Sequence, residues 1–293
     1  MIHSWLTHGF LLAAFSIGSA GNPVYDGAIL ADEEDVIVVS PNYRVSIFGF
    51  SGAPTESTSN VGFLDQRLAL EWTRDNIEAF GGDPKRITVF GQSAGAMSAD
   101  LMIYAFPDDP IARAIIPQSG VITGTLPEFF SVWPTRDLWY IASKNLGCGG
   151  EEAGEATVEC VRSKSVPDIL KSIEPLQLTA IFSGFFPVFD DLYKNYAPQG
   201  QVGEFAKIPV LLGCTSNEIA FFVIIIIAYT DITQEELDLI IPLLPLVQPL
   251  LDIITYASFT VSDFTFSLCS SLVLMLNPTH GPYNCLVSDW VSC

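Results

Sequence analysis

A short serine motif is the part of this sequence best suited to covalent chemistry. Residues 91–95 read Gly-Gln-Ser-Ala-Gly, a G-x-S-x-G pattern between a strand-like apolar run at 87–90 and a helix-like run at 96–105. Glycine on each side of the serine removes the Cβ atoms that would clash in a tight turn. We therefore expect Ser93 to project its hydroxyl from a strained turn, where a base can activate it as a nucleophile.

The residue after the serine has a role in the same chemistry. At the start of a helix, the backbone N–H of Ala94 would point at a negatively charged oxygen and stabilise it. A chance match in a loop rich in glycine and serine is the alternative interpretation. The strand and helix patterns that flank the motif favour the strained turn.

Apolar runs predict the strands that would hold this turn. They lie at residues 36–39, 87–90, 114–116 and 209–212. A helix is predicted over residues 65–80, with Leu68, Trp72 and Phe80 on one stripe and a glycine-rich stop after it.

Strands that alternate with helices indicate a mostly parallel α/β sheet. In such sheets the reactive groups gather at the carboxyl ends of the strands. Ser93 follows one predicted strand and Glu218 follows another. No internal repeat or linker divides the chain, so we expect a single domain over residues 1–293.

The composition restricts the partners of the protein. The 293 residues carry 13 Lys and Arg against 33 Asp and Glu, a formal charge of −20. A surface this acidic repels phosphate backbones, so nucleic acid is not an expected partner. The longest apolar run, residues 219–229, is too short for a spanning helix of about 20 residues, which argues against membrane association. An apolar stretch at residues 10–15 lacks the preceding positive charge of a signal peptide.

Six cysteines leave the redox compartment open. Cys148 and Cys160 flank a polar loop rich in glycine and glutamate. From their spacing, either a disulfide, which would imply an oxidising compartment, or two free thiols is possible. The sequence does not pair Cys269, Cys285 or Cys293.

Several motifs in order resemble those of the type-B carboxylesterases, the cholinesterase and fungal-lipase branch of the α/β-hydrolases. The motifs are Asn-Val-Gly-Phe-Leu-Asp-Gln-Arg at 60–67, Ala-Leu-Glu-Trp at 69–72, Phe-Gly-Gly-Asp-Pro at 80–84 and Phe-Gly-Gln-Ser-Ala-Gly at 90–95. The resemblance covers about residues 15–269, with 1–14 and 270–293 divergent. It implies an α/β-hydrolase fold, a mostly parallel sheet with helices on both faces. Because family members extend further on both sides, we expect this chain to be truncated at both ends.

The resemblance also implies roles for individual residues. Ser93, Glu218 and His280 would form a Ser-Glu-His triad, and the backbone of Ala94 would serve the oxyanion. No metal or cofactor is implied. Arg44 and Asp65 are similar to a structural ion pair of the family, and Cys148 and Cys160 to its small disulfide loop. The family is typically secreted and acts on small-molecule or lipid esters.

Two departures from the family pattern leave alternatives open. Ala13 and Ala14 stand where the family has a glycine-rich oxyanion loop, and alanine reaches positive φ only at a cost. His280 lies 280 − 218 = 62 residues after Glu218, a shorter spacing than the family's, so it is either the catalytic base or a loop histidine.

Three functions are consistent with this pattern. The leading hypothesis is a carboxylic-ester hydrolase that works through a serine acyl-enzyme. A catalytically impaired or inert esterase-like fragment or binding protein is the alternative that the two departures suggest. A membrane-associated lipase is a third, suggested by the apolar residues 219–251.

Overall fold

A mostly parallel β-sheet forms the centre of the protein. The computed structural model describes residues 3–7, 15–54, 58–120, 135–177, 184–188, 203–213 and 274–276. Within these residues the sheet has the strand order β2-β1-β3-β4-β5-β6, and all neighbours are parallel except β5 and β6. The strands are β1 (His3–Thr7), β2 (Val36–Val39), β3 (Ile87–Gln92), β4 (Ala114–Gln118), β5 (Val210–Leu212) and β6 (Leu274–Leu276). The four predicted strands and their parallel pairing are confirmed.

Strand β1 was not predicted, although it pairs with both β2 and β3. Its sequence, His-Ser-Trp-Leu-Thr, is short and mixes polar with apolar residues. Buried parallel strands are normally identified by continuous apolar runs, and this segment has none. The same criterion missed β6, which spans three residues at the antiparallel edge.

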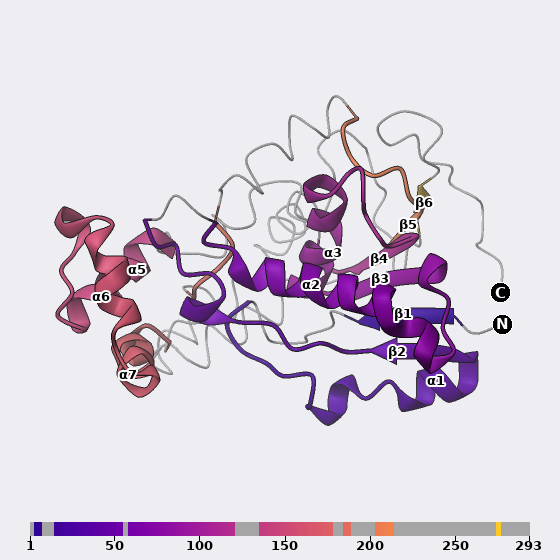
Figure 1. Cartoon of the computed structure of the whole chain (residues 1–293), viewed down its shortest axis with the longest axis horizontal. Coiled ribbons are helices and arrows are strands. Elements are labelled where there is room, and N and C mark those ends of the chain that lie inside the picture. The colour runs from indigo at the N-terminus through magenta and orange to yellow at the C-terminus, as the bar shows by residue number, and fades with distance from the viewer. Residues whose placement is uncertain are drawn as a thin grey trace, which may run out of the picture.

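Helices connect the strands. The α-helices are α1 (Ala28–Glu34), α2 (Val61–Asn76), α3 (Ala94–Ala105), α5 (Thr135–Asn145), α6 (Ala156–Arg162) and α7 (Val166–Gln177). The 3₁₀-helices are η1 (Pro23–Tyr25), η2 (Ser46–Phe48), η3 (Ile77–Phe80), η4 (Pro84–Arg86) and η5 (Glu151–Ala153). Figure 1 shows α5, α6 and α7 gathered at one end of the molecule, away from the strands, while α3 packs on β3 and β4.

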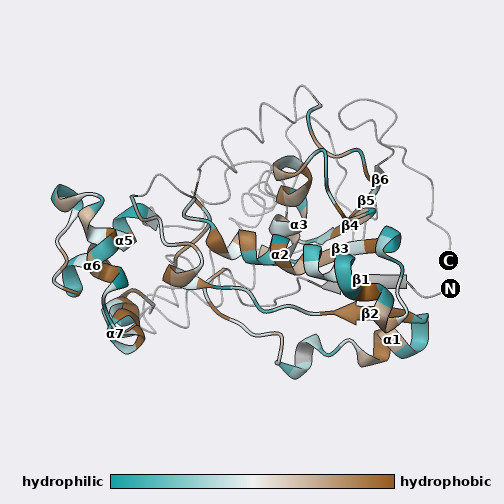
Figure 2. Cartoon of the chain, viewed as in Figure 1, coloured by the Kyte–Doolittle hydropathy of each residue, from teal (hydrophilic) through white to brown (hydrophobic). Residues whose placement is uncertain are grey.

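The helix predicted over residues 65–80 is present as α2 followed by η3, and it ends at Gly81 in a left-handed conformation with φ 85°. The hydrophobic stripe expected on it lies on the solvent side. Leu68, Trp72 and Phe80 are 63%, 50% and 62% exposed, and the Trp72 and Phe80 rings contact each other. Hydrophobic and hydrophilic residues both occur along α2 (Figure 2). Its buried face includes Gln66, Arg67 and Thr73, so apolar spacing alone pointed to the wrong side.

One core joins the sheet to its helices. Buried residues of β3, α3, α2, α5 and α7 belong to a single hydrophobic cluster that includes Val89, Leu101, Leu70, Trp139 and Ile173. Residues 10–14 of the apolar N-terminal stretch and the apolar residues 219–251 lie outside the described residues. No helix in the described part of the chain is both long enough and apolar enough to cross a bilayer.

Candidate active site

Ser93 occupies the turn between β3 and α3. Gln92 is the last residue of the strand and Ala94 is the first of the helix. The Ser93 backbone has φ 56° and ψ −117°, in the left-handed half of conformational space, and the residue is partly exposed. A residue other than glycine held there costs about 1–3 kcal/mol, and such strain is typical of functional sites. The strand, strained turn and helix expected around this serine are therefore present.

The start of α3 provides donors next to Ser93. The first N–H groups of an α-helix have no acceptor within the helix, and the helix dipole favours negative charge there. Ala94, whose N–H is the first of these, is 1% exposed. The Ser93 carbonyl oxygen accepts a hydrogen bond from the Met97 N–H at 3.0 Å. The Ala94 carbonyl oxygen accepts one from the Ser98 hydroxyl at 2.9 Å. These bonds hold the first turn of the helix in place beside the serine.

The ends of the neighbouring strands are joined to the Ser93 turn. The Ser93 N–H donates to the Gln118 carbonyl at 2.9 Å, and the Ser119 N–H donates to the Gly213 carbonyl at 2.7 Å. Ser119 is itself left-handed, with φ 53°. The carboxyl ends of β3, β4 and β5 thus meet at one edge of the sheet. Glu218 follows β5 in the sequence and lies outside the described residues.

Phe15 marks the point where the chain leaves the predicted oxyanion segment. It is buried and left-handed, with φ 61°. Its ring packs edge-on against Phe50 at 5.0 Å and Phe186 at 6.4 Å between centroids, and its carbonyl accepts the Ser46 N–H at 2.8 Å. The structure therefore fixes the residue that follows Ala13 and Ala14, while these alanines lie outside the described residues.

The segment at residues 184–188 is held by two buried side chains. The Asn60 amide donates to the Val188 carbonyl at 2.8 Å and accepts its N–H at 2.9 Å. The Thr135 hydroxyl makes the same pair of bonds with Phe186, at 3.2 and 3.3 Å. These reciprocal bonds keep Phe186 against Phe15. The sequence did not predict the contact between Phe15 and Phe186, because these two residues are more than a hundred positions apart in the chain.

Arg44 and Asp65 form the expected ion pair. The guanidinium reaches both carboxylate oxygens at 2.7 Å, and the Arg44 backbone N–H adds a third bond at 3.0 Å. Partial burial acts to raise the pKa of Asp65, but the hydrogen bonds from Arg44 outweigh it and hold that pKa below its usual value. The pair connects the segment before η2 to α2.

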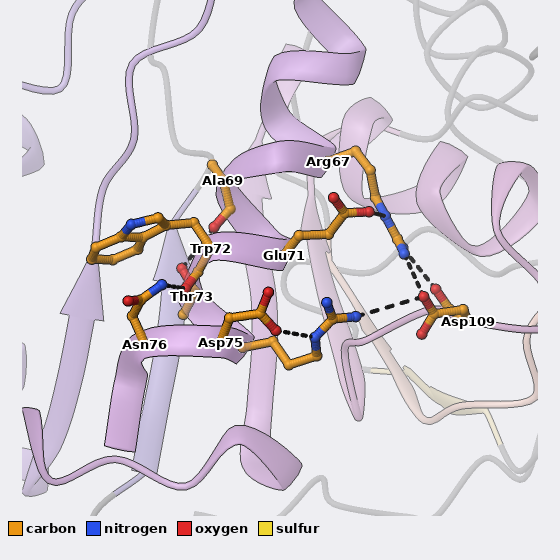
Figure 3. Close-up of polar contacts among 9 residues, drawn as sticks. Arg67, Ala69, Glu71, Trp72, Thr73, Asp75, Asn76 and Asp109 are labelled. Carbon is orange, nitrogen blue, oxygen red and sulfur yellow. Dashed lines mark hydrogen bonds and ion pairs between the residues drawn. The ribbon is translucent and has the colours of Figure 1, made fainter. Parts of the chain in front are cut away.

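Arg67 connects α2 to the segment after α3 (Figure 3). Its guanidinium bonds Glu71 at 2.8 Å and both the carbonyl and the carboxylate of Asp109 at 2.6 Å. It also lies 4.2 Å over the Phe106 ring. Because the Arg67 side chain is only 8% exposed, these contacts satisfy a nearly buried charge. They fix the segment by which α3 leads back to β4.

Cys148 and Cys160 are joined by a disulfide. The bond closes the segment that runs from the end of α5 through η5 into α6. Of the two possibilities left open by the spacing, the structure has the bonded one.

The remaining predicted site residues are not described. Glu218, His280, Ala13 and Ala14 all fall outside the described residues. Among the residues that are described, no group of three or more His, Cys, Asp or Glu side chains could hold a metal ion.

Comparison with known proteins identifies the family. The model of the carboxylesterase family matches residues 10–242. The chain belongs to this family. A carboxylesterase-family chain has the α/β-hydrolase fold, in agreement with the parallel sheet and its helices. The match begins earlier and ends earlier than the range of about 15–269 expected from the motifs.

Three acetylcholinesterases are among the relatives of this carboxylesterase-family chain. It is 39% identical to that of Electrophorus electricus over 224 residues, 37% to that of Bungarus fasciatus over 219 and 35% to that of Danio rerio over 221. Each alignment covers 72% of this chain and 34% or 35% of the relative. The chain therefore spans about a third of the length of these curated relatives.

Proposed function

We propose that this protein hydrolyses carboxylic esters through a serine acyl-enzyme. The observation that supports this most directly is the left-handed Ser93 between β3 and α3, at the edge of the sheet where three strand ends meet. In that position the hydroxyl can reach a bound ester while the helix start supplies N–H donors. Family membership agrees with this chemistry.

In the proposed reaction, Ser93 Oγ attacks the ester carbonyl and transfers its proton to a histidine base. The carbonyl oxygen becomes an oxyanion that the N–H of Ala94 stabilises, with Ala13 and Ala14 as the proposed further donors. The ester C–O bond then breaks, the alcohol leaves with the proton that the histidine returns, and the acyl group stays on Ser93. Water attacks this acyl-enzyme by the same steps, which releases the carboxylic acid and restores the Ser93 hydroxyl.

Glu218 is the proposed acid that orients the histidine. It follows β5, whose carboxyl end is joined to the end of β4 next to Ser93. His280 is the proposed base, as the histidine that follows this acid in the sequence. Contact of His280 with Ser93 and of Glu218 with His280 remains a prediction. Nothing observed specifically favours an inert protein or a membrane-associated lipase.

The substrate class is proposed to be a small-molecule ester. The relatives are acetylcholinesterases by name, and a protein of charge −20 attracts cationic substrates. We therefore propose choline esters as the first substrates to compare with neutral esters. The Cys148–Cys160 disulfide supports a secreted location, because such bonds persist in oxidising compartments.

Hydrolysis of p-nitrophenyl butyrate by the wild-type protein and by Ser93→Ala tests the function. Loss of a serine nucleophile lowers turnover by about 10⁴-fold or more, so the variant should be inactive. Ser172→Ala is a matched control, because it removes a buried hydroxyl that bonds the Ile169 carbonyl in α7, away from Ser93. A fluorophosphonate should label wild type and Ser172→Ala at Ser93. Equal hydrolysis by wild type and Ser93→Ala would reject the proposal.

A further inference from the structure

The last residue of β4 and a glycine just after the strand hold the Ser93 peptide from two sides. On one side, the Ser93 N–H donates to the Gln118 carbonyl at 2.9 Å. On the other side, the Ser93 carbonyl oxygen faces Gly120, where a Cβ would lie only 2.7 Å from it. Real Cβ atoms do not approach another atom this closely, so the contact exists only because residue 120 has no side chain.

The segment around Gly120 cannot easily move away from Ser93 to make room for a side chain. The Ser119 N–H is bound to the Gly213 carbonyl of the next strand end at 2.7 Å, so the segment cannot simply retreat from Ser93. A Cβ on Gly120 would also meet Ala96 Cβ at 3.2 Å, which closes the side toward α3. The atoms in the way are mainly backbone atoms, which cannot rotate aside as a flexible side chain can.

The need for glycine here is steric and not conformational. The backbone of Gly120 does not have the left-handed φ that disfavours other residues, so alanine could adopt its conformation. A side chain at position 120 would therefore act by displacing the backbone of Ser93, which is the proposed nucleophile.

We propose that Gly120 is a positioning residue for Ser93: by lacking a side chain it lets the end of β4 fix the nucleophile's backbone at its reactive place. The inference rests on the proposed function for its catalytic consequence, but its geometric content stands independently. A displacement of about 1 Å at a reacting group costs about 10²-fold in rate.

Gly120→Ala tests the proposal against Gly21→Ala. At Gly21 a Cβ would meet only the Ser19 hydroxyl oxygen at an ordinary 3.5 Å, without left-handed φ. We expect Gly120→Ala to lower kcat by about 10²-fold with KM changed less than about twofold, because substrate binding is not the step affected. Gly21→Ala should match wild type. Equal kcat for Gly120→Ala and wild type would overturn the proposal.

Hydrogen exchange of single amides supplies a readout that needs no activity. In Gly120→Ala the Ser93 amide should exchange about tenfold faster or more, because its bond to Gln118 is disturbed, while the Leu70 amide in α2 keeps its wild-type rate. An unchanged Ser93 amide, or equal acceleration at Leu70, would overturn the proposal. If wild type shows neither hydrolysis nor fluorophosphonate labelling, the proposed function fails and the exchange result alone decides the role of Gly120.

Discussion

At the scale of single residues, Asp65 connects pH to stability. Its carboxylate accepts three hydrogen bonds from Arg44, which hold its pKa below the usual value despite partial burial. A carboxyl group with a lowered pKa in the folded state stabilises the protein above its unfolded pKa, near 3.9. This contribution is lost as the pH falls through the lower, folded pKa.

We therefore expect Asp65→Asn to lower the free energy of unfolding by about 1 kcal/mol at neutral pH, because a charged, bidentate pair is lost at a partly exposed site. The difference from wild type should shrink toward zero as the pH falls through the lowered pKa of folded Asp65, where the carboxyl group becomes protonated. Urea unfolding at neutral pH and at a series of acidic pH values measures it. Asp32→Asn, at an exposed position on α1, is the control and should leave the free energy of unfolding at neutral pH within about 0.5 kcal/mol of wild type. A difference that stays constant with pH would contradict the assignment.

The sequence predicted the Ser93 turn because the signal for it is local. A strand, a G-x-S-x-G motif and a helix follow one another within about twenty residues. The requirement at Gly120 was not predictable in this way, since it depends on how closely a segment 27 residues further along (120 − 93) approaches the turn. The roles of Glu218 and His280 stay predictions for the same reason: they depend on long-range approach.

At the scale of elements, α2 shows why helix position was easier to predict than helix orientation. The helix and its stop at Gly81 follow from local sequence. Its buried face includes an arginine, which hydropathy assigns to the surface. Arg67 is buried because Asp109, Glu71 and Phe106 meet it there, and these contacts involve a segment beyond α3. Strand β1 was missed for a related reason, since its partners and not its composition make it a central strand.

Arg67→Lys should weaken the connection between α2 and the segment after α3. A lysine can replace one charged contact but not the planar fork that binds the carbonyl and carboxylate of Asp109 together. We expect the free energy of unfolding to fall by about 2 kcal/mol, measured by urea denaturation.

Arg74→Lys is the matched control for this change. Arg74 lies on the same helix and also reaches Asp109, at 3.7 Å, but its side chain is 38% exposed. Its replacement should leave stability nearly unchanged, because solvent already screens the pair. If the two variants lost the same stability, the buried position of Arg67 would have no special importance.

At the scale of the whole molecule, the excess of acidic residues is the dominant electrostatic property. With 33 acidic and 13 basic side chains, most charges repel one another in the folded state. Salt screens this repulsion over a Debye length that falls from about 30 Å at 10 mM to about 8 Å at 0.15 M. Raising NaCl over that range should therefore increase the unfolding temperature.

We expect an increase of about 2–4 °C, equivalent to about 1 kcal/mol for a chain of this size. Differential scanning calorimetry measures it. Potassium chloride at equal ionic strength should give the same shift, because screening depends on ionic strength and not on which cation is present. A lower unfolding temperature in salt would show that attractive ion pairs outweigh the net repulsion.

The left-handed backbone of Ser93 has a consequence for evolution in this lineage. A serine at φ 56° is held there against its own preference, whereas glycine would adopt the same conformation at ease. Without selection for hydrolysis, drift would thus tend to replace this serine by glycine. The resulting protein would be more stable but would lack the proposed nucleophile. Selection for turnover would oppose that replacement and keep the serine hydroxyl at this strained position.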